Sequence, residues 1–188
     1  MGYTHSWSRP QVISPAAFHA ITADFQQVMP ALETAGSPIA NAHGLEEPEF
    51  APDHIRFNGV RHCGHAPNPE VRLPWPGNGA GGIGSNVGIT SGTLSFRTCN
   101  GDCSYESVWF DRCIDTEWTD EDGTSSSFCK TAFRPYDLAL TVFLLIAKQH
   151  LGREFRIKTD GEAAQWEDAQ RLCQAELDYS LSFEEVVE

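Results

Sequence analysis

The segment from Tyr136 to Leu151 constrains the fold more than any other part of the chain, because it has the length of a helix and is apolar nearly all round. A helix without a polar face has to be covered on every side, so we expect it to be central and buried. Arg134-Pro135 precedes the segment and Gly152 ends it, as is typical of helix boundaries. The strand-like run Glu154–Lys158 follows.

Patterns elsewhere predict strands and two more helices. Ser14-Pro15 has the residues of a helix start, and the next apolar residues repeat at helical spacing until Gly36. Another helix is expected after Thr159–Glu162, whose first and last residues match a capping box. The expected strands are Met1–Trp7, His54–Phe57 before an Asn58-Gly59 turn, Thr93–Thr98 and Ser107–Phe110. This order predicts an α+β fold with a mixed, mainly antiparallel sheet and about three helices.

A length of 188 residues and an apolar content of 40% fit one globular domain over residues 1–188. Pro67–Gly92 is rich in glycine and proline and is predicted to be a long loop or insertion. Asp115–Ser127 is acidic and polar, which indicates a solvated loop. The acidic tail over residues 182–188 is expected to fray.

The chain is strongly acidic, with a formal net charge of −13. A field of this sign repels phosphate backbones, which argues against direct binding to duplex nucleic acid and suits a basic protein partner. The longest apolar run, Leu138–Ala147, is too short to span a bilayer, and the first residues lack the features of a signal peptide. We therefore expect a cytoplasmic protein whose six cysteines are thiols or metal ligands rather than disulfides.

The start of the apolar helix is the first candidate site. Lys130 and Arg134 stand just before it, and the free backbone amides of a first helical turn point toward the same volume. Cationic side chains and free amides together favour a phosphate or carboxylate. Predicted ligand-binding residues are Lys130, Thr131, Arg134, Tyr136, Asp160 and Trp7, and His5 and Asp137 are the predicted catalytic residues. In the alternative interpretation, Lys130 and Arg134 only pair with neighbouring carboxylates.

A second candidate site combines histidines and cysteines. His62, Cys63 and His65 lie before the glycine-rich stretch, and Cys99 and Cys103 lie after it. Imidazole and thiolate groups of this kind would bind zinc, which would pin the long loop shut. The spacing is not that of a zinc ribbon, since no C-x-x-C pair is present, so ordinary loop histidines and reduced thiols are the alternative.

The chain resembles a family of small, functionally uncharacterised proteins of bacteriophages and bacteria. The resemblance rests on Met1–His5 with Trp7, on Phe57–Gly59, on Phe128–Ala132, on Pro135–Asp137 and on Asp160-Gly161. It is absent over roughly residues 60–104, and Ser6 stands where the family leads us to expect an aromatic residue. It implies a phage or mobile-element setting without an activity. It also groups His5, Asn58, Lys130, Thr131, Tyr136, Asp137 and Asp160 as candidate site residues, which adds Asn58 to the ligand-binding set.

Three functions compete at this point. The first is binding of a small anionic, nucleotide-like ligand, with or without its cleavage or modification. In a phage protein acting in the host cytoplasm, that ligand would be a host nucleotide signal and the role would be anti-defence. The second is an acidic interaction module that blocks a basic or nucleic-acid-binding partner. The third is a zinc-dependent hydrolase or a zinc-stapled domain. The residues alone do not decide whether the protein is an enzyme.

Overall fold

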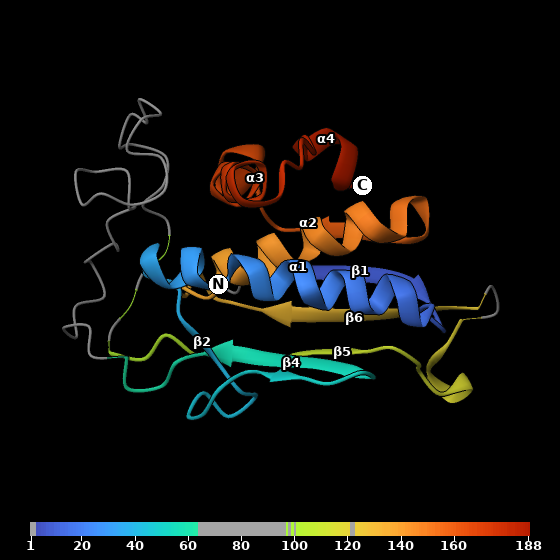
Figure 1. Ribbon diagram of the computed structural model, residues 1–188, viewed down its shortest axis with the longest axis horizontal. Helices are drawn as coiled ribbons and strands as arrows, with labels where there is room; N and C mark the ends of the chain where they lie inside the picture. The colour runs from blue at the N-terminus through green and yellow to red at the C-terminus, as the bar shows by residue number, and fades with distance from the viewer. Residues whose placement is uncertain (1–2, 64–96, 98, 100, 121–122) are drawn as a thin grey trace.

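The computed structural model describes residues 3–63, 97, 99, 101–120 and 123–188. Within these residues, four α-helices accompany two antiparallel sheets, which confirms the α+β class (Figure 1). None of the described helices has the length and apolar character needed to cross a membrane. The elements are β1 (Thr4–Pro10), α1 (Pro15–Thr34), β2 (Ile39–Ala40), β3 (Glu49–Phe50), β4 (His54–Gly59), β5 (Val108–Asp111), η1 (Thr116–Trp118), β6 (Thr124–Lys130), α2 (Asp137–Leu151), η2 (Gly152–Glu154), β7 (Arg156–Thr159), α3 (Ala163–Leu177) and α4 (Phe183–Val186).

Helix α2 is the centre of the molecule, as its composition predicts. All its residues from Asp137 to Ala147 are buried. It packs against α1 and α3, and Figure 1 shows it between α3 and α4 on one side and the sheet of β4 and β5 on the other. The ring of Phe143 lies 5.2 Å from that of Phe25, 5.8 Å from Phe57 and 4.9 Å from Phe110, which joins α1, β4 and β5 to this helix.

Helix α1 also follows its prediction. The Ser14 hydroxyl accepts a hydrogen bond from the Ala17 N–H at 3.2 Å, and Pro15 occupies the first turn. Gly36, with φ of 76°, follows the cap residue Ala35 at the other end. The buried stripe consists of the apolar residues that repeat at helical spacing, together with Ala31: Phe18, Ile21, Phe25, Val28 and Leu32.

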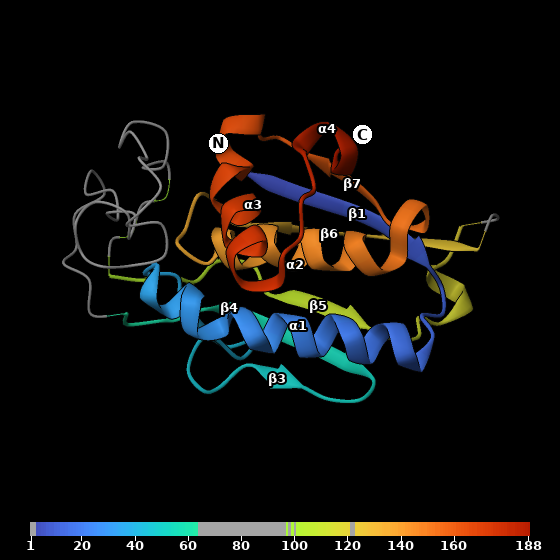
Figure 2. The ribbon, with the colours of Figure 1, turned by 45° about the horizontal axis from the view of Figure 1, so that its top comes forward.

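The first sheet has the order β6-β1-β7, seen side by side in Figure 2. Side chains of β1 alternate between half-buried and buried, so His5, Trp7 and Arg9 face the core. Ser6 lies between Phe128 of β6 and Lys158 of β7 in the register. Strand β6 begins at Thr124, inside the segment predicted to be a loop. The reason is that every residue from Thr124 to Lys130 pairs with β1.

The second sheet is built around β4, which pairs with β2, β3 and β5. Asn58 and Gly59 were predicted to form a turn, but they are the last residues of β4 and pair with β2. Gly59 is required by a close approach: a Cβ atom there would lie 2.0 Å from the carbonyl oxygen of Cys103. The predicted insertion Pro67–Gly92 lies outside the described residues, as does most of the predicted strand Thr93–Thr98.

Two predictions at the carboxyl-terminal end are wrong. Thr159 does not cap α3, because it ends β7 and the helix begins only at Ala163, where Glu162 is the N-cap residue and forms the capping box with Gln165. The acidic tail does not fray but forms α4, where Val186 is buried. The backbone N–H of Glu188 then donates to the carbonyl oxygen of Ile157 at 2.9 Å, which ties the tail to β7.

Replacing Phe143 with alanine is expected to lower the free energy of unfolding by about 3–5 kcal/mol, since the ring is fully buried among three other phenylalanines. Trp118→Ala removes a side chain that is 74% exposed and is expected to change it by less than about 0.5 kcal/mol. Chemical denaturation measures both. Equal losses in the two variants would contradict the central position of α2.

Candidate functional site

The start of α2, where the sequence predicts an anion site, is closed by the chain itself. The backbone N–H groups of Thr131 and Ala132 both donate to the carbonyl oxygen of Tyr3, at 2.9 and 3.4 Å. The N–H of Asp137 donates to the carbonyl oxygen of Arg134 at 3.0 Å. These amides are used within the fold, so they are not free to bind an anion.

The two aromatic residues predicted to stack on a ligand are part of the core. Tyr136 is fully buried, and its hydroxyl lies 2.7 Å from the carbonyl oxygen of Glu106 and 3.0 Å from that of Lys130. Burial raises the pKa of this hydroxyl far above its ordinary value, so it stays protonated and donates. Trp7 is 2% exposed. Neither ring presents a face to a ligand, because a sheet and helices cover both.

The two predicted cations have different surroundings. The Lys130 side chain is exposed, whereas Arg134 is half-buried. Burial acts to raise the pKa of Asp102, but hydrogen bonds from Ser104 and the charges of Arg134 and Arg61 hold it below its ordinary value. Arg134 therefore contributes to the electrostatic surroundings of Asp102, a carboxylate of its own chain.

His5 and Asp137, the predicted catalytic pair, do meet on the inner side of the first sheet. His5 Nε2 lies 2.8 Å from Asp137 Oδ1, and the Thr131 hydroxyl donates to the same oxygen at 2.6 Å. The other ring nitrogen, Nδ1, lies 2.9 Å from the hydroxyl oxygen of Thr159. The imidazole thus joins β1 to α2 and to the end of β7, and the Asp137 carboxylate adds the β6–α2 connection through Thr131.

Arg97 extends this network to α3. Its Nε lies 3.2 Å from Asp137 Oδ2, and its Nη1 lies 2.9 Å from Asp168 Oδ2. All three side chains are buried. Burial acts to raise the pKa of Asp137, but the charges and hydrogen bonds of His5 and Arg97 hold it below its ordinary range. Burial outweighs Arg97 at Asp168 and raises the pKa of that carboxyl to about 6.

The hydroxyl, imidazole and carboxylate of Thr159, His5 and Asp137 follow one another in the order used by serine hydrolases. The Gly161 N–H donates to the Thr159 oxygen at 3.0 Å, which leaves the threonine proton for His5. However, His5 is fully buried, with the Tyr3 ring 4.8 Å away and the Trp166 ring 5.4 Å away. A substrate does not reach the imidazole in this arrangement, so the network connects elements rather than exposing a nucleophile.

Asn58 and Asp160 also hold the backbone. The Asn58 amide nitrogen donates to the carbonyl oxygen of Tyr105 and to the Ser107 hydroxyl, both at 3.1 Å, while its oxygen accepts from the Gly59 and Tyr105 N–H groups. An exposed Asp160 accepts from the Thr4 N–H at 3.1 Å and so fixes the start of β1.

A polar surface lies on the side of the first sheet that faces away from α2, and we call it the outer face. The outer face consists of Ser6 and Ser8 on β1, Ser126, Phe128 and Lys130 on β6, and Arg156 and Lys158 on β7. Phe128 is 62% exposed, and the side chains of Lys130, Arg156 and Lys158 are exposed as well. Three cations and an open aromatic ring thus share one surface of a strongly acidic chain.

A hollow of about 230 Å³ lies on the outer face, lined by Ser6, Ser8, Ser126, Arg156, Lys158 and part of Trp7. Of these residues, only Trp7 was predicted from the sequence to bind a ligand. Lys130 is the one other predicted ligand-binding residue among those that make up the outer face. Alternation in β1 and in Phe155–Lys158 marks one side of each strand as polar. This signal could have pointed to the face, but only the strand order shows that the polar sides coincide.

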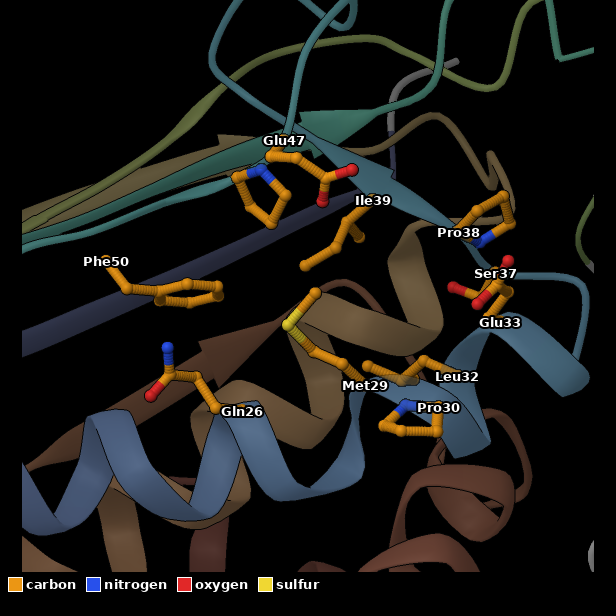
Figure 3. A pocket seen from close by; sticks show the side chains of 11 residues that line it. Gln26, Met29, Pro30, Leu32, Glu33, Ser37, Pro38, Ile39, Glu47 and Phe50 are labelled. Atoms are coloured by element: carbon orange, nitrogen blue, oxygen red, sulfur yellow. The ribbon is translucent and has the colours of Figure 1, made fainter.

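Another hollow, of about 640 Å³, lies between α1 and the β2–β3 region. Figure 3 shows Met29 and Ile39 extending toward one another across it, with Phe50 beside them. The exposed carboxylates of Glu33 and Glu47 also line it, so an anion is disfavoured there. Its volume is within the range of small-molecule sites.

Three of the five predicted metal ligands come together. Cys99 Sγ lies 3.2 Å from Cys63 Sγ and 3.3 Å from Cys103 Sγ, and all three sulfur atoms lie within 4.8 Å of one another. His62 is exposed and does not join this group, and His65 lies outside the described residues. Burial raises the pKa of the Cys99 and Cys103 thiols, as expected for sulfur atoms withdrawn from water. The Cys63, Cys99 and Cys103 set is called the thiol cluster below.

Asp168→Asn is expected to flatten the pH dependence of stability between pH 4 and 6. The folded pKa of about 6 exceeds the ordinary 3.8, so the folded state binds the proton more tightly and the free energy of unfolding falls as pH rises through this window. The slope is at most about 1.4 kcal/mol per pH unit. Asp137, whose pKa is lowered, acts in the opposite direction and only at lower pH.

Urea denaturation at several pH values measures this slope. Asp115→Asn, at an exposed position, is the matched control and is expected to keep the wild-type slope. An unchanged slope in Asp168→Asn would show that Arg97 keeps the Asp168 carboxyl ionised in the folded protein.

Comparison with protein-family models, characterised proteins and solved structures finds no significant match to this chain. The arrangement of its own side chains is therefore the basis for a functional proposal. Among the described residues, that arrangement offers an open cationic surface, an acidic groove (the hollow between α1 and the β2–β3 region) and a group of converging thiols.

Proposed function

We propose that the protein binds a small phosphate-bearing, nucleotide-like ligand on the outer face. The observation that carries this proposal is the grouping of Lys130, Arg156 and Lys158 with the exposed ring of Phe128 on one sheet surface. The surface differs from the helix start at which the sequence predicts the anion, although Lys130 belongs to both.

Charge supports an anionic ligand. The chain as a whole has a net charge of −13, so three cations on one surface create a local field opposite in sign to the overall charge. Lysine and arginine form charge-assisted hydrogen bonds to phosphate oxygens, each worth about 1.5–3 kcal/mol. Two carboxylates border the outer face and accept backbone hydrogen bonds there, Asp160 from the Thr4 N–H at 3.1 Å and Glu106 from the Lys130 N–H at 2.7 Å.

The register arranges complementary groups across neighbouring strands. Ser6 lies between Phe128 and Lys158, and Ser8 lies between Ser126 and Arg156. Adjacent strands are about 4.8 Å apart, so the aromatic ring and the cations are separated by about 10 Å at most in the strand-to-strand direction. A base stacked on Phe128 would leave its sugar and phosphate over the serine hydroxyls and the cations.

The size of the hollow and the overall charge favour a small ligand over a polymer. About 230 Å³ is enough for a phosphate with part of a sugar, and it is below the usual range of pockets that enclose a whole ligand. A long polyanion would also meet the acidic remainder of the surface. In the phage setting that the resemblance implies, sequestering a host nucleotide signal is the role such binding would serve.

The outer face is proposed to bind the ligand without cleaving or modifying it. His5 and Asp137, the candidates for proton transfer, lie on the opposite side of the same sheet and are fully covered. An enzyme would need its acid or base within hydrogen-bonding distance of the ligand. The buried network instead stiffens β1 and β7 beneath the outer face, which limits the entropy lost on binding.

Lys158→Ala is expected to raise the Kd for a nucleoside diphosphate about tenfold or more, because one charge-assisted hydrogen bond is lost. Phe128→Ala removes the stacking surface, and a loss of about 1–3 kcal/mol corresponds to a weakening of roughly five- to 150-fold. Isothermal titration calorimetry measures both, with cyclic dinucleotides, inorganic phosphate and a neutral nucleoside as further probes. Arg153→Ala, an exposed cation on η2 outside the face, is the matched control.

Several outcomes would overturn this assignment. Binding that survives both Lys158→Ala and Phe128→Ala places the ligand elsewhere. Loss of binding in Arg134→Ala with full binding in Lys158→Ala would return the site to the start of α2. Much tighter binding of a single-stranded oligonucleotide than of any mononucleotide would change the ligand class.

A second candidate function is docking of a basic protein segment in the acidic groove between α1 and the β2–β3 region. The groove combines apolar side chains with the exposed carboxylates of Glu33 and Glu47, and the whole chain is acidic. Apolar contacts and opposite charges together suit a segment with both lysine and aliphatic residues. This agrees with the interaction module that composition alone suggests.

Joint replacement of Glu33 and Glu47 by glutamine is expected to slow association with a lysine-rich amphipathic peptide and to reduce the salt dependence of its affinity. Fluorescence anisotropy at rising salt measures both quantities. Glu184→Gln, an exposed acid on α4, is the control. Affinity that ignores salt in the unaltered protein argues against this partner.

A further inference from the structure

The thiol cluster lies where the chain leaves β4 and where it returns ahead of β5. The Cys103 N–H donates to the Val60 carbonyl oxygen at 3.0 Å, and the Cys103 backbone presses on Gly59 so closely that no Cβ fits there. Cys63 follows β4 by four residues. The cluster therefore has a rigid base in the second sheet.

The distances between the sulfur atoms distinguish a disulfide from a metal site. A disulfide requires about 2.05 Å between sulfur atoms, well below the 3.2 Å between Cys63 and Cys99 and the 3.3 Å between Cys99 and Cys103. Tetrahedral zinc with Zn–S bonds of about 2.3 Å places its sulfur ligands about 3.8 Å apart. The third pair, Cys63 and Cys103, lies within 4.8 Å, so a small outward shift of each sulfur would seat the ion.

We propose that Cys63, Cys99 and Cys103 form a three-thiolate zinc site. Binding exchanges three thiol protons for one divalent cation, so the site as a whole carries one negative charge. Thiolates select zinc and other thiophilic ions over magnesium and calcium. A disulfide would use two of the three sulfurs and leave the third, whereas a metal uses them all.

The consequence for the fold is a link between two parts of the chain. Cys63 follows β4, while Cys99 and Cys103 belong to the segment that precedes β5. Arg97, two residues before Cys99, reaches Asp137 and Asp168. A metal at the cluster would fix this segment at one end while Arg97 anchors it to α2 and α3. Three protein ligands leave a fourth position for water or another donor.

The site is independent of the outer face, so the two proposals can fail separately. Full-length protein purified under reducing conditions without chelators is expected to contain about one equivalent of zinc per chain by plasma mass spectrometry. Cys99→Ser, at the sulfur that touches both others, is expected to lose it. Cys113→Ser, an exposed cysteine outside the cluster, is the matched control and is expected to retain it.

A second measurement keeps the test decisive if Cys99→Ser does not fold. Metal-free wild-type protein titrated with Co²⁺ is expected to develop thiolate-to-cobalt charge-transfer absorption that saturates near one equivalent and disappears when zinc is added. Zinc well below one equivalent together with no charge-transfer band overturns the proposal. A disulfide between two of the three cysteines in protein taken directly from cells, or zinc lost from Cys113→Ser but retained in Cys99→Ser, overturns it as well.

Discussion

The pairing of a carboxylate in the buried first turn of α2 is the interaction on which the rest of this structure depends. A buried charge is costly unless it is paired and hydrogen-bonded. Asp137 therefore receives His5 from β1, Thr131 from the connection after β6 and Arg97 from the segment before β5. Each of these partners comes from a different part of the chain, so compensating one carboxylate fixes how the first sheet, α2 and α3 fit together.

The need to pair the buried Asp137 carboxylate also separates the residues that stabilise the fold from those that remain open to solvent. In β1, neighbouring residues point to opposite sides of the sheet, so His5 lies in the core and Ser6 lies on the outer face. The inner side is closed by Asp137, Tyr3 and Trp166, which leaves no access to the imidazole. The outer face keeps its hydroxyls, cations and Phe128 in solvent. Polar residues that look like one candidate site along the sequence are thus divided between a structural network and an exposed surface.

Local patterns predicted the helices well and their polar ends less well. Helix α1, with its Ser14 cap, and the burial of α2 follow from local patterns. A helix with one apolar stripe buries that stripe, whereas a helix that is apolar all round has to be covered on every side. Thr159 fits a capping box by spacing, yet it bonds His5 instead, and Glu162 takes the cap. Spacing identifies groups able to cap a helix, but long-range competition decides which one does.

The sequence by itself determined the α+β class, the central helix and the residue types available for chemistry, including His5 and Asp137. It also marked Cys63, Cys99 and Cys103 as candidate metal ligands. Only the tertiary structure decided that the amides before α2 are taken by Tyr3, and that Lys158 shares a surface with Phe128. The physical reason is that these hydrogen-bond partners and sheet neighbours come from segments far apart in the chain, such as Tyr3 and Thr131, and no local pattern encodes which of them meet.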